Sequence, residues 1–291
     1  MALELDTRQR AMLQEMGVHV WLPETGVAIL AQAAPSVPRA RPAQPGAVAQ
    51  TPGAAIGRSQ APAPAPVSGI PDFHAVPLVA ASADWAALTE AVRTCQACAV
   101  CSGRTHATLL PPAENGAQCD WMVVGDAPDE EEDRAGAPFA GQDGVLLGNM
   151  LRALGLQRAN PLPSAAQGPV PPAAQRAYVT NVLKCRPAPG AMPQATELAQ
   201  CATYLQREIA RVQPKVILAM GRYANQVLLA ETPALVLQPL GKLRGTLHRY
   251  QGVPVVVTYP PKLLMRNSAD KAKAWADLCF AADALGAAHA G

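Results

Sequence analysis

No stretch of this sequence is long and apolar enough to cross a membrane, and neither sign of charge is in large excess. A membrane helix needs roughly 20 predominantly apolar residues, and the start of the chain lacks the basic and then apolar pattern of a secretory signal. With 24 basic and 22 acidic residues the formal net charge is +2, so a surface for a polyanion must be a local patch. We therefore expect a cytoplasmic protein with no membrane partner.

Two motifs of nucleotide-binding enzymes are also missing. The chain has neither G-x-G-x-x-G nor a P-loop, which disfavours an unrelated doubly wound nucleotide-binding enzyme. Its seven cysteines are an odd number, and without a secretory signal this count fits reduced thiols better than a framework of disulfides. The cysteines are therefore candidate metal ligands.

Residues 31–70 differ in composition from the rest of the chain. They contain eight prolines, three arginines and no acidic residue, so they cannot bury enough apolar area to offset their ordering entropy, and we predict a disordered linker. Residues 1–30 are predicted to hold a short helical segment, amphipathic through Leu5, Met12 and Val20. This segment either docks on a protein partner or folds back onto the main domain, which we expect at 71–291.

Apolar runs without polar alternation mark four candidate strands, as expected for parallel strands covered on both faces. The runs are Trp121–Val124, Tyr178–Val182, Val216–Met220 and Val255–Thr258. Helical patterns separate them, at about 146–154, 198–209 and 223–230, and a last helix is expected after Asn267 or Ser268. This alternation predicts an α/β fold, a three-layer α/β/α sandwich with a four-stranded parallel sheet.

Ligands of open parallel sheets bind beyond the carboxyl ends of the strands. At or directly after the carboxyl end of each predicted strand lie residues that suit a binding site. They are Gly125 and Asp126 for the first strand, Asn181 for the second, Gly221 for the third, and Tyr259 with Pro260 for the last. The sequence therefore predicts a functional site at this edge of the sheet.

Four cysteines form two groups separated by an α/β unit. Cys95 and Cys98 are a C-x2-C pair, and Cys185 and Cys201 have fifteen residues between them. Thiolates with such spacing hold either zinc or an iron–sulfur cluster, and the spacing leaves both open. Cys101 is an alternative ligand, because it follows Cys98 by three residues.

Several segments, in order, resemble one known family. The chain has the C-x2-C pair followed by Arg104, GDAP at 125–128 with Asp133 beyond it, GAPFAG at 136–141, NVLKCRP at 181–187, Cys201, and TYPP at 258–261 before Arg266. From Cys95 to about Leu285, roughly two thirds of the chain, it resembles a bacterial type-4 uracil-DNA glycosylase, of the uracil-DNA glycosylase superfamily.

The resemblance implies a hydrolase of base-excision repair. Such an enzyme cleaves the N-glycosidic bond of uracil in single- or double-stranded DNA, and we expect a monomer associated with the nucleoid. The resemblance also implies a [4Fe–4S] cluster, structural in role, held by Cys95, Cys98, Cys185 and Cys201. Zinc stays the alternative that the spacing permits.

The resemblance further implies a pocket for a flipped base, which is read there by stacking and hydrogen bonds. Phe139 is expected to stack on the base, the alternative being an ordinary core ring. Asn181 is expected to match N3–H and O4 of uracil and to reject the amino group of cytosine. The expected substrate-binding residues are Gly125, Asp126, Ala127, Pro128, Phe139, Asn181 and Pro260. Asp126 and Glu132 are the expected catalytic acids, although Glu132 could instead be an acid at a helix N-terminus.

Three positions depart from the family's pattern. Asp126 stands where the family has glutamate, Asp129 where it has glycine, and Pro260 where it has a histidine that donates to uracil O2. Proline has no side-chain donor and no backbone N–H, and losing a donor to a developing oxyanion costs on the order of 100- to 1000-fold in rate. Lys262 is the nearer substitute, and His248 could approach. The alternative function is a catalytically degenerate paralogue that binds DNA.

Basic residues surround the expected site. Contacts of lysine and arginine to phosphates position DNA without reading its sequence. The residues that we expect to bind DNA are Lys184, Arg186, Arg244, Lys262 and Arg266.

We predict that deletion of residues 1–70 leaves base excision unchanged, because a proline- and alanine-rich segment without acidic residues has little to contribute to a packed site. Uracil release by the truncated and the full-length protein should agree at equal concentration. A truncated protein that is unfolded, or folded but inactive, contradicts this prediction.

Overall fold

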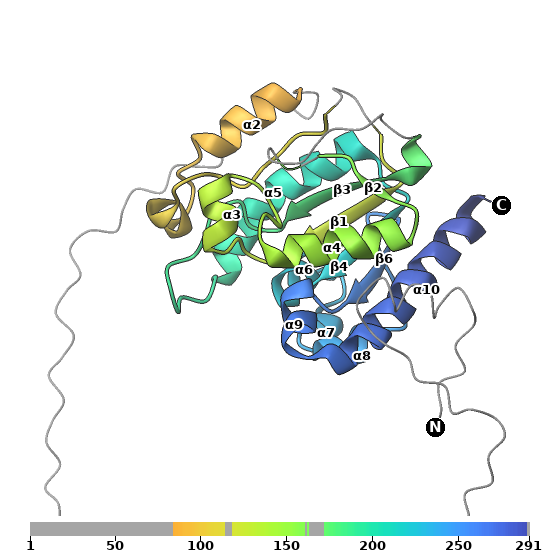
Figure 1. Ribbon diagram of the computed structural model, residues 1–291. Helices are drawn as coiled ribbons and strands as arrows, with labels where there is room; N and C mark the ends of the chain where they lie inside the picture. Colours follow the sequence, from red (N-terminus) through yellow and green to blue (C-terminus); the bar gives the residue numbers. More distant parts are fainter. Residues whose placement is uncertain (1–83, 114–117, 161, 163–171, 290–291) are drawn as a thin grey trace, which may run out of the picture. The chain divides into compact units, whose positions relative to one another are not determined.

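The computed structural model describes residues 84–113, 118–160, 162 and 172–289 (Figure 1). The helical segment predicted at 1–30 and the linker predicted at 31–70 lie outside the described residues, so both stay predictions. The described residues all fall within the main domain expected at 71–291.

A six-stranded sheet forms the centre of this domain, in the order β2-β3-β1-β4-β6-β5. The strands are β1 (Trp121–Gly125), β2 (Gln157–Arg158), β3 (Arg176–Asn181), β4 (Val216–Met220), β5 (Leu247–Tyr250) and β6 (Val253–Thr258). All neighbours are parallel except β5, which is antiparallel to β6. The four predicted strands are the central four, and the fold class is confirmed.

The two additional strands lie at the edges of the sheet, and each lacks the signal that marks the central ones. β2 has only two residues. In β5, exposed and buried residues alternate, the pattern of a strand covered on one face rather than on both.

Each face of the sheet has its own hydrophobic core, because successive side chains of a strand point to opposite faces. In β1, Met122 and Val124 belong to one core, whereas Trp121 and Val123 belong to the other. Helices α2 (Trp85–Arg93), α5 (Ala195–Val212) and α6 (Arg222–Leu228) contribute to the first core, and α4 (Gln142–Ala153) and α10 (Lys271–His289) to the second. Figure 1 shows helices on both sides of the sheet, which makes three layers.

Helices α4, α5, α6 and α10 lie where the sequence predicts them, α2 was not predicted, and short helices occupy the connections. The short ones are η1 (Ala99–Gly103), α3 (Glu130–Ala135), η2 (Ala173–Gln175), α7 (Pro233–Val236), α8 (Leu240–Leu243), α9 (Pro261–Arg266) and η3 (Ser268–Asp270). In the part of the chain that the structure describes, no helix combines the length and the apolar content needed to span a bilayer.

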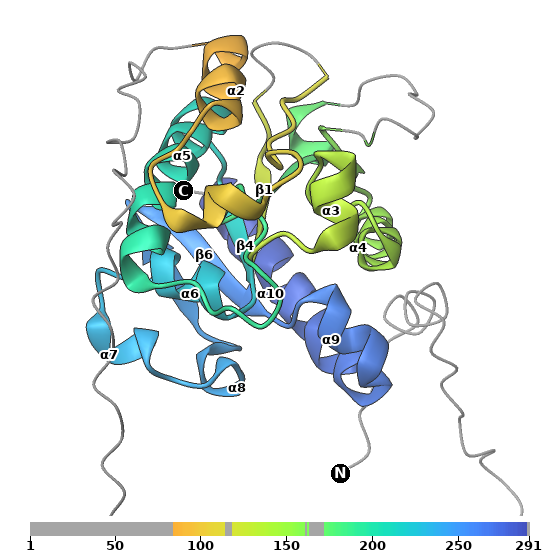
Figure 2. The ribbon, with the colours of Figure 1, turned by 90° about the vertical axis from the view of Figure 1, so that its left-hand side faces the viewer.

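Parallel pairing brings the candidate residues to one edge of the sheet. Gly125 pairs with Asn181 across β1 and β3, and β4 and β6 run in the same direction on the other side of β1. Gly221 and Tyr259 therefore follow at the same edge. Figure 2 looks onto this edge, from which α3, α6 and α9 continue.

Candidate active site and thiol chamber

The candidate active site begins where β1 and β3 end. A Cβ atom built on Gly125 would lie 2.5 Å from Cζ of Phe139 and 2.6 Å from Oδ1 of Asn181. Because Gly125 has no side chain, the aromatic ring and the amide can both lie against its backbone. The structure thus brings together three predicted substrate-binding residues from separate segments.

Phe139 has an unusual backbone conformation, and its carbonyl group lies close to α4. Its φ angle is 52°, a region that residues other than glycine rarely adopt. A Cβ atom on Gly144 would lie 1.8 Å from the carbonyl oxygen of Phe139, so α4 can approach this turn only with glycine there. The ring is 5% exposed and belongs to a hydrophobic core. Phe139 is therefore a core ring that also faces the site.

Arg158 supports the same turn, and sequence reasoning missed it. Its Nη2 donates to the carbonyl of Pro138 at 2.7 Å and its Nε to the carbonyl of Asn160 at 2.7 Å. Desolvation lowers the pKa of Arg158 to about 10. No motif marks this residue, because it lies in the two-residue edge strand β2.

The buried carboxylate of Glu132 accepts hydrogen bonds from three segments. Its Oε1 accepts from the backbone N–H of Phe139 at 2.5 Å and from Nδ2 of Asn181 at 2.8 Å, and its Oε2 accepts from the N–H of Asp129 at 2.8 Å. Desolvation raises the pKa of Glu132, although these donors oppose the rise. Glu132 and Asp129 form a capping box at the start of α3, so the helix-terminal role is present. The same carboxylate also sets the orientation of the Asn181 amide.

The carboxylate of Asp126 is engaged at the start of α6. It accepts the backbone N–H groups of Arg222, Tyr223 and Ala224 at 3.0, 2.7 and 2.9 Å, and a Cβ atom on Gly221 would lie 2.3 Å from it. Desolvation raises the pKa of Asp126 in spite of these amides. These bonds attach the loop after β1 to the start of α6, and the catalytic role of Asp126 stays a prediction.

One departure from the resembled family's pattern, Asp129, forms an ion pair with Lys262, which follows another, Pro260, by two residues. Nζ of Lys262 in α9 lies 2.7 Å from Oδ2 of Asp129, the N-cap of α3. Desolvation lowers the pKa of Lys262, but the carboxylate of Asp129 outweighs it and raises the pKa overall. Desolvation likewise raises the pKa of Asp129, but its bonds to Lys262 and to the amides of α3 bring it below its ordinary value.

Neither Pro260 nor His248 supplies the missing donor. Pro260 is the N-cap of α9 and has no hydrogen to donate. His248 lies in β5, where it is 8% exposed, and its Nε2 is 2.8 Å from the carbonyl oxygen of Leu243. The expectation that His248 could approach the site is therefore wrong, because its ring is buried in β5. This strand forms the edge of the sheet that is farthest from β3.

Lys184 is buried rather than exposed to DNA. Its side chain is 1% exposed, and Nζ donates to Oγ1 of Thr180 at 2.7 Å and to the carbonyl of Asn181 at 2.6 Å. It also pairs with Glu208, which accepts from the hydroxyl of Tyr178 at 3.1 Å. The predicted DNA contact of Lys184 is therefore wrong, because an ammonium held by buried partners cannot reach a phosphate.

Arg244 is also held by the protein itself. Its guanidinium makes two hydrogen bonds to Asp277, at 2.6 and 3.0 Å, and lies 4.5 Å from the ring centre of Tyr259. A bidentate pair of this kind fixes Arg244 beside Tyr259 and does not fit the predicted phosphate contact. Of the remaining expected contacts, Lys262 and Arg266 are exposed, and Arg186 is partly exposed and pairs with Glu130 at 3.3 Å.

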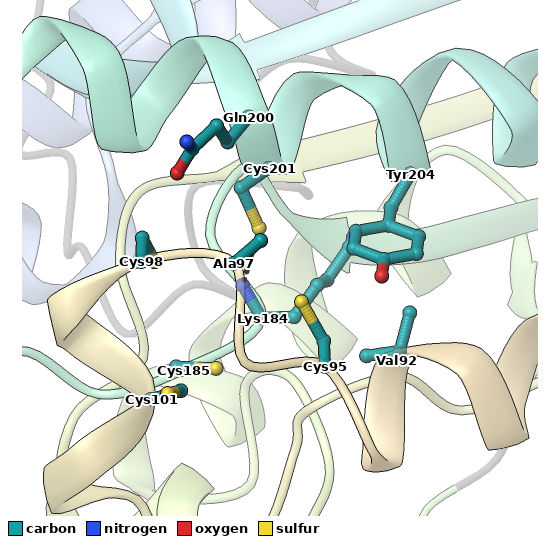
Figure 3. A pocket seen from close by; sticks show the side chains of 10 residues that line it. All are labelled: Val92, Cys95, Ala97, Cys98, Cys101, Lys184, Cys185, Gln200, Cys201 and Tyr204. Carbon is teal, nitrogen blue, oxygen red and sulfur yellow. Dashed lines mark hydrogen bonds between the residues drawn. The ribbon is translucent and has the colours of Figure 1, made fainter. Parts of the chain in front are cut away.

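The two groups of cysteines meet in space, as predicted, around a cavity of about 20 Å³ (Figure 3). We call this cavity and its lining the thiol chamber. The residues that line it are Val92, Cys95, Ala97, Cys98, Cys101, Lys184, Cys185, Gln200, Cys201 and Tyr204. Cys101 is therefore near the four predicted ligands.

The chemistry of the thiol chamber suits a thiolate-bound metal centre. Nη1 of Arg104 lies 3.2 Å from Sγ of Cys185, and the backbone N–H of Lys184 lies 3.3 Å from Sγ of Cys201. Desolvation raises the pKa of Cys185 to about 11 and of Cys201 to about 12, so without a metal these thiols are neutral. Soft sulfur ligands with nearby donors fit zinc or an iron–sulfur cluster. Among the described residues, no three cysteine, histidine or acidic side chains are arranged to hold a single metal ion.

Asp133 connects the cysteine-bearing loop to α3. Its carboxylate accepts the backbone N–H of Thr105 at 2.9 and 3.0 Å and that of His106 at 3.3 Å. The motif in the sequence marked Asp133 but not these partners. Through α3, the thiol chamber and the candidate active site share one support.

Comparison with known proteins assigns a family to this arrangement. Residues 111–279 match the model of the uracil DNA glycosylase superfamily. The type-4 uracil-DNA glycosylase of Sulfurisphaera tokodaii is 30% identical over 184 residues, 62% of this chain and 75% of the relative. Those of Pyrobaculum aerophilum and Thermotoga maritima are 31% and 30% identical over 197 and 185 residues, covering 66% and 63% of this chain and 90% and 84% of each relative.

We predict that Gly125→Ala lowers the free energy of unfolding by about 1–3 kcal/mol, because the new methyl group overlaps the Phe139 ring and the Asn181 amide. Gly148→Ala is the matched control. A Cβ atom added to Gly148 in α4 would meet nothing within 4 Å, so helix propensity should raise the stability by about 0.5–1 kcal/mol. Urea unfolding measures both, and equal effects would contradict the close contact at Gly125.

Proposed function

This chain belongs to the uracil DNA glycosylase superfamily, on its type-4 branch, and on this basis we propose that it hydrolyses the N-glycosidic bond of uracil in DNA. Water replaces the base on the sugar, and free uracil and an abasic site are the products. The observation that carries the proposal is the meeting of Gly125, Phe139 and Asn181 at the carboxyl edge of the sheet.

Asn181 is the residue that reads the base in this proposal. Because its Nδ2 donates to Glu132, one N–H remains for O4 of uracil and Oδ1 accepts from N3–H. Cytosine presents an amino group and a bare N3 in the same places, so it meets two mismatched groups. Glu132 is a positioning residue here, because it acts through the amide of Asn181.

The leaving base must be stabilised as its negative charge develops. The backbone N–H groups of Asp126 and Ala127 are the donors available in the loop after β1, since Pro128 has none. The carboxylate of Asp126 holds this loop against the start of α6. That attachment preorganises the loop, so its amides need little rearrangement during the reaction.

We also propose that the thiol chamber holds a [4Fe–4S] cluster on Cys95, Cys98, Cys185 and Cys201. Support comes from a lining that contains sulfur ligands and no carboxylate and from the positive charges of Arg104 and Lys184, which offset the negative charge of a four-thiolate cluster. When bound, the cluster supplies a cross-link between the two cysteine segments and no step of the hydrolysis. Zinc is the alternative that metal analysis tests.

DNA is the proposed macromolecular partner. Arg186, which is partly exposed, and Arg266, which is exposed, are the proposed phosphate contacts. The alternative is a catalytically degenerate paralogue, because Pro260 replaces the family's histidine. Such a protein would bind uracil-containing DNA but release no base.

We predict that Asn181→Ala lowers single-turnover uracil release by about 100- to 1000-fold, because the base loses both of its reading hydrogen bonds. Asn149→Ala is the matched control, since Asn149 lies on α4 and bonds only Arg152 among the described contacts. The Asn181 variant should still unfold in one cooperative thermal transition, at a lower midpoint because Glu132 loses a donor, and that transition shows that the fold survives. Equal rates for the two variants contradict the proposed role.

We predict about four irons per purified chain, with a broad absorbance typical of an iron–sulfur protein. Cys201→Ser should remove the absorbance and destabilise the domain, whereas Cys279→Ser, outside the thiol chamber, should leave it unchanged. Elemental analysis and the visible spectrum are the measurements. One zinc per colourless chain would overturn the cluster assignment.

A further inference from the structure

The proposed reaction lacks a donor where the departing base carries its charge. When the glycosidic bond breaks, its electron pair stays with uracil, and negative charge develops on the ring and on O2. Pro260 and Pro261 occupy the start of α9, and neither can donate a hydrogen bond. Any residue that fills this gap does so within the proposed uracil excision, and its role rests on that function.

Lys262 follows the two prolines directly and reaches across the carboxyl edge of the sheet. Its ammonium contacts Asp129 at 2.7 Å, so it joins α9, which follows β6, to α3, which follows β1 (Figure 2). β4 lies between these two strands in the sheet. The ion pair therefore spans the end of β4 and ties α9 to the start of α3, the helix whose Glu132 binds Asn181. The prolines fix their own φ angles, and this restricts the backbone that precedes Lys262 at the start of α9.

The surroundings of Lys262 keep it charged and connect it to the base-reading amide. Desolvation lowers its pKa, but the facing carboxylates of Asp129, Asp143 and Glu132 raise it overall. Asp129 is bonded twice to Glu132, through Oδ1 at 3.0 Å and through its own N–H at 2.8 Å. Glu132 in turn binds Asn181. An ammonium has three N–H donors, and Asp129 engages one of them.

We propose that the ammonium of Lys262, held in place by Asp129, stabilises the negative charge that develops on uracil as it leaves. Lys262 thereby takes the place of the absent histidine as the electrostatic partner of the base. The bond from the sugar to N1 breaks with its electron pair going to uracil, and the oxygen of water bonds to the sugar and gives up a proton to solvent. Lys262 donates a hydrogen bond and transfers no proton.

Two other roles for Lys262 predict different measurements. A phosphate contact would weaken binding to every DNA strand and reduce the slope of log affinity against log salt by about 1. A purely structural link between α3 and α9 would lower stability and slow the release of every base alike. Stabilisation of a leaving anion is sensitive to the leaving group itself.

The test compares Lys262→Met with Lys215→Met in single-turnover release of uracil and of 5-fluorouracil from the same DNA. Lys215 is a matched control, because it pairs with Asp120 at 3.1 Å and is 47% exposed, against 53% for Lys262, but lies before β4 at the opposite end of the sheet. Lys262→Met should slow uracil release by about 10- to 100-fold, less than a fully buried oxyanion donor costs. Lys215→Met should not slow it.

The leaving group separates electrostatic stabilisation from the other roles. Fluorine withdraws electrons and makes the departing anion more stable, so this anion needs less help from Lys262. The fall in release rate caused by Lys262→Met should therefore be roughly several-fold smaller for 5-fluorouracil than for uracil. The affinity for uncleaved DNA should change much less than the rate. Pro260→His in the Lys262→Met background should recover most of the lost rate, because it restores a donor.

Each contrary result has a distinct meaning. If the wild-type protein releases no uracil, the proposed function fails and this role fails with it. If the wild type is active but Lys262→Met matches Lys215→Met, only the role of Lys262 is overturned. Equal losses for uracil and 5-fluorouracil, together with weaker binding or lower stability, also overturn it and assign Lys262 to phosphate contact or to structure.

Discussion

The buried carboxylate of Glu132 joins the three segments from which the candidate active site is built. It accepts hydrogen bonds from the cap of α3, from the turn that carries Phe139 and from the amide of Asn181 at the end of β3. A carboxylate can stay in such a place only if donors satisfy it, because each unsatisfied buried group costs about 1–3 kcal/mol. The direction of the Asn181 amide is therefore tied to the conformation of the Phe139 turn and to the start of α3. The proposed reading of uracil by Asn181 therefore depends on the orientation that Glu132 gives to its amide.

A second buried network lies behind the first and connects it to the thiol chamber. The ammonium of Lys184 binds the carbonyl of Asn181 and pairs with Glu208 of α5, the helix that also carries Cys201. The backbone N–H of Lys184 points to the sulfur of that same cysteine. Removing one partner of a buried ion pair leaves the other uncompensated, which costs about 3–5 kcal/mol. The network therefore ties the thiol chamber to the end of β3, where Asn181 lies.

Asp129 and Pro260 each depart from the family's pattern in a direction that, taken alone, argues against activity. An added carboxylate could repel the phosphates of DNA, and a proline removes a donor. In the folded chain the carboxylate of Asp129 caps α3 and is paired with Lys262. Its charge is thus compensated, and the same contact places a cation beside the site from which the histidine is missing.

Patterns along the chain were enough to predict the central sheet, the long helices and the grouping of the cysteines. Strand and helix periodicity are local properties, and parallel strands place their carboxyl ends at one edge, so Gly125 and Asn181 could be assigned to one site. Only the family resemblance added Phe139. The edge strand β5, the cap that Asp126 provides and the burial of Lys184 and Arg244 could be seen only in the folded chain. The partners of Asp126 lie 96 to 98 residues away in the chain, and that of Arg244 lies 33 residues away. Lys262 and Asp129 are 133 residues apart. A charged residue near a strand end reads the same in sequence whether it faces solvent or an opposite charge, and only the packing of distant segments separates the two cases.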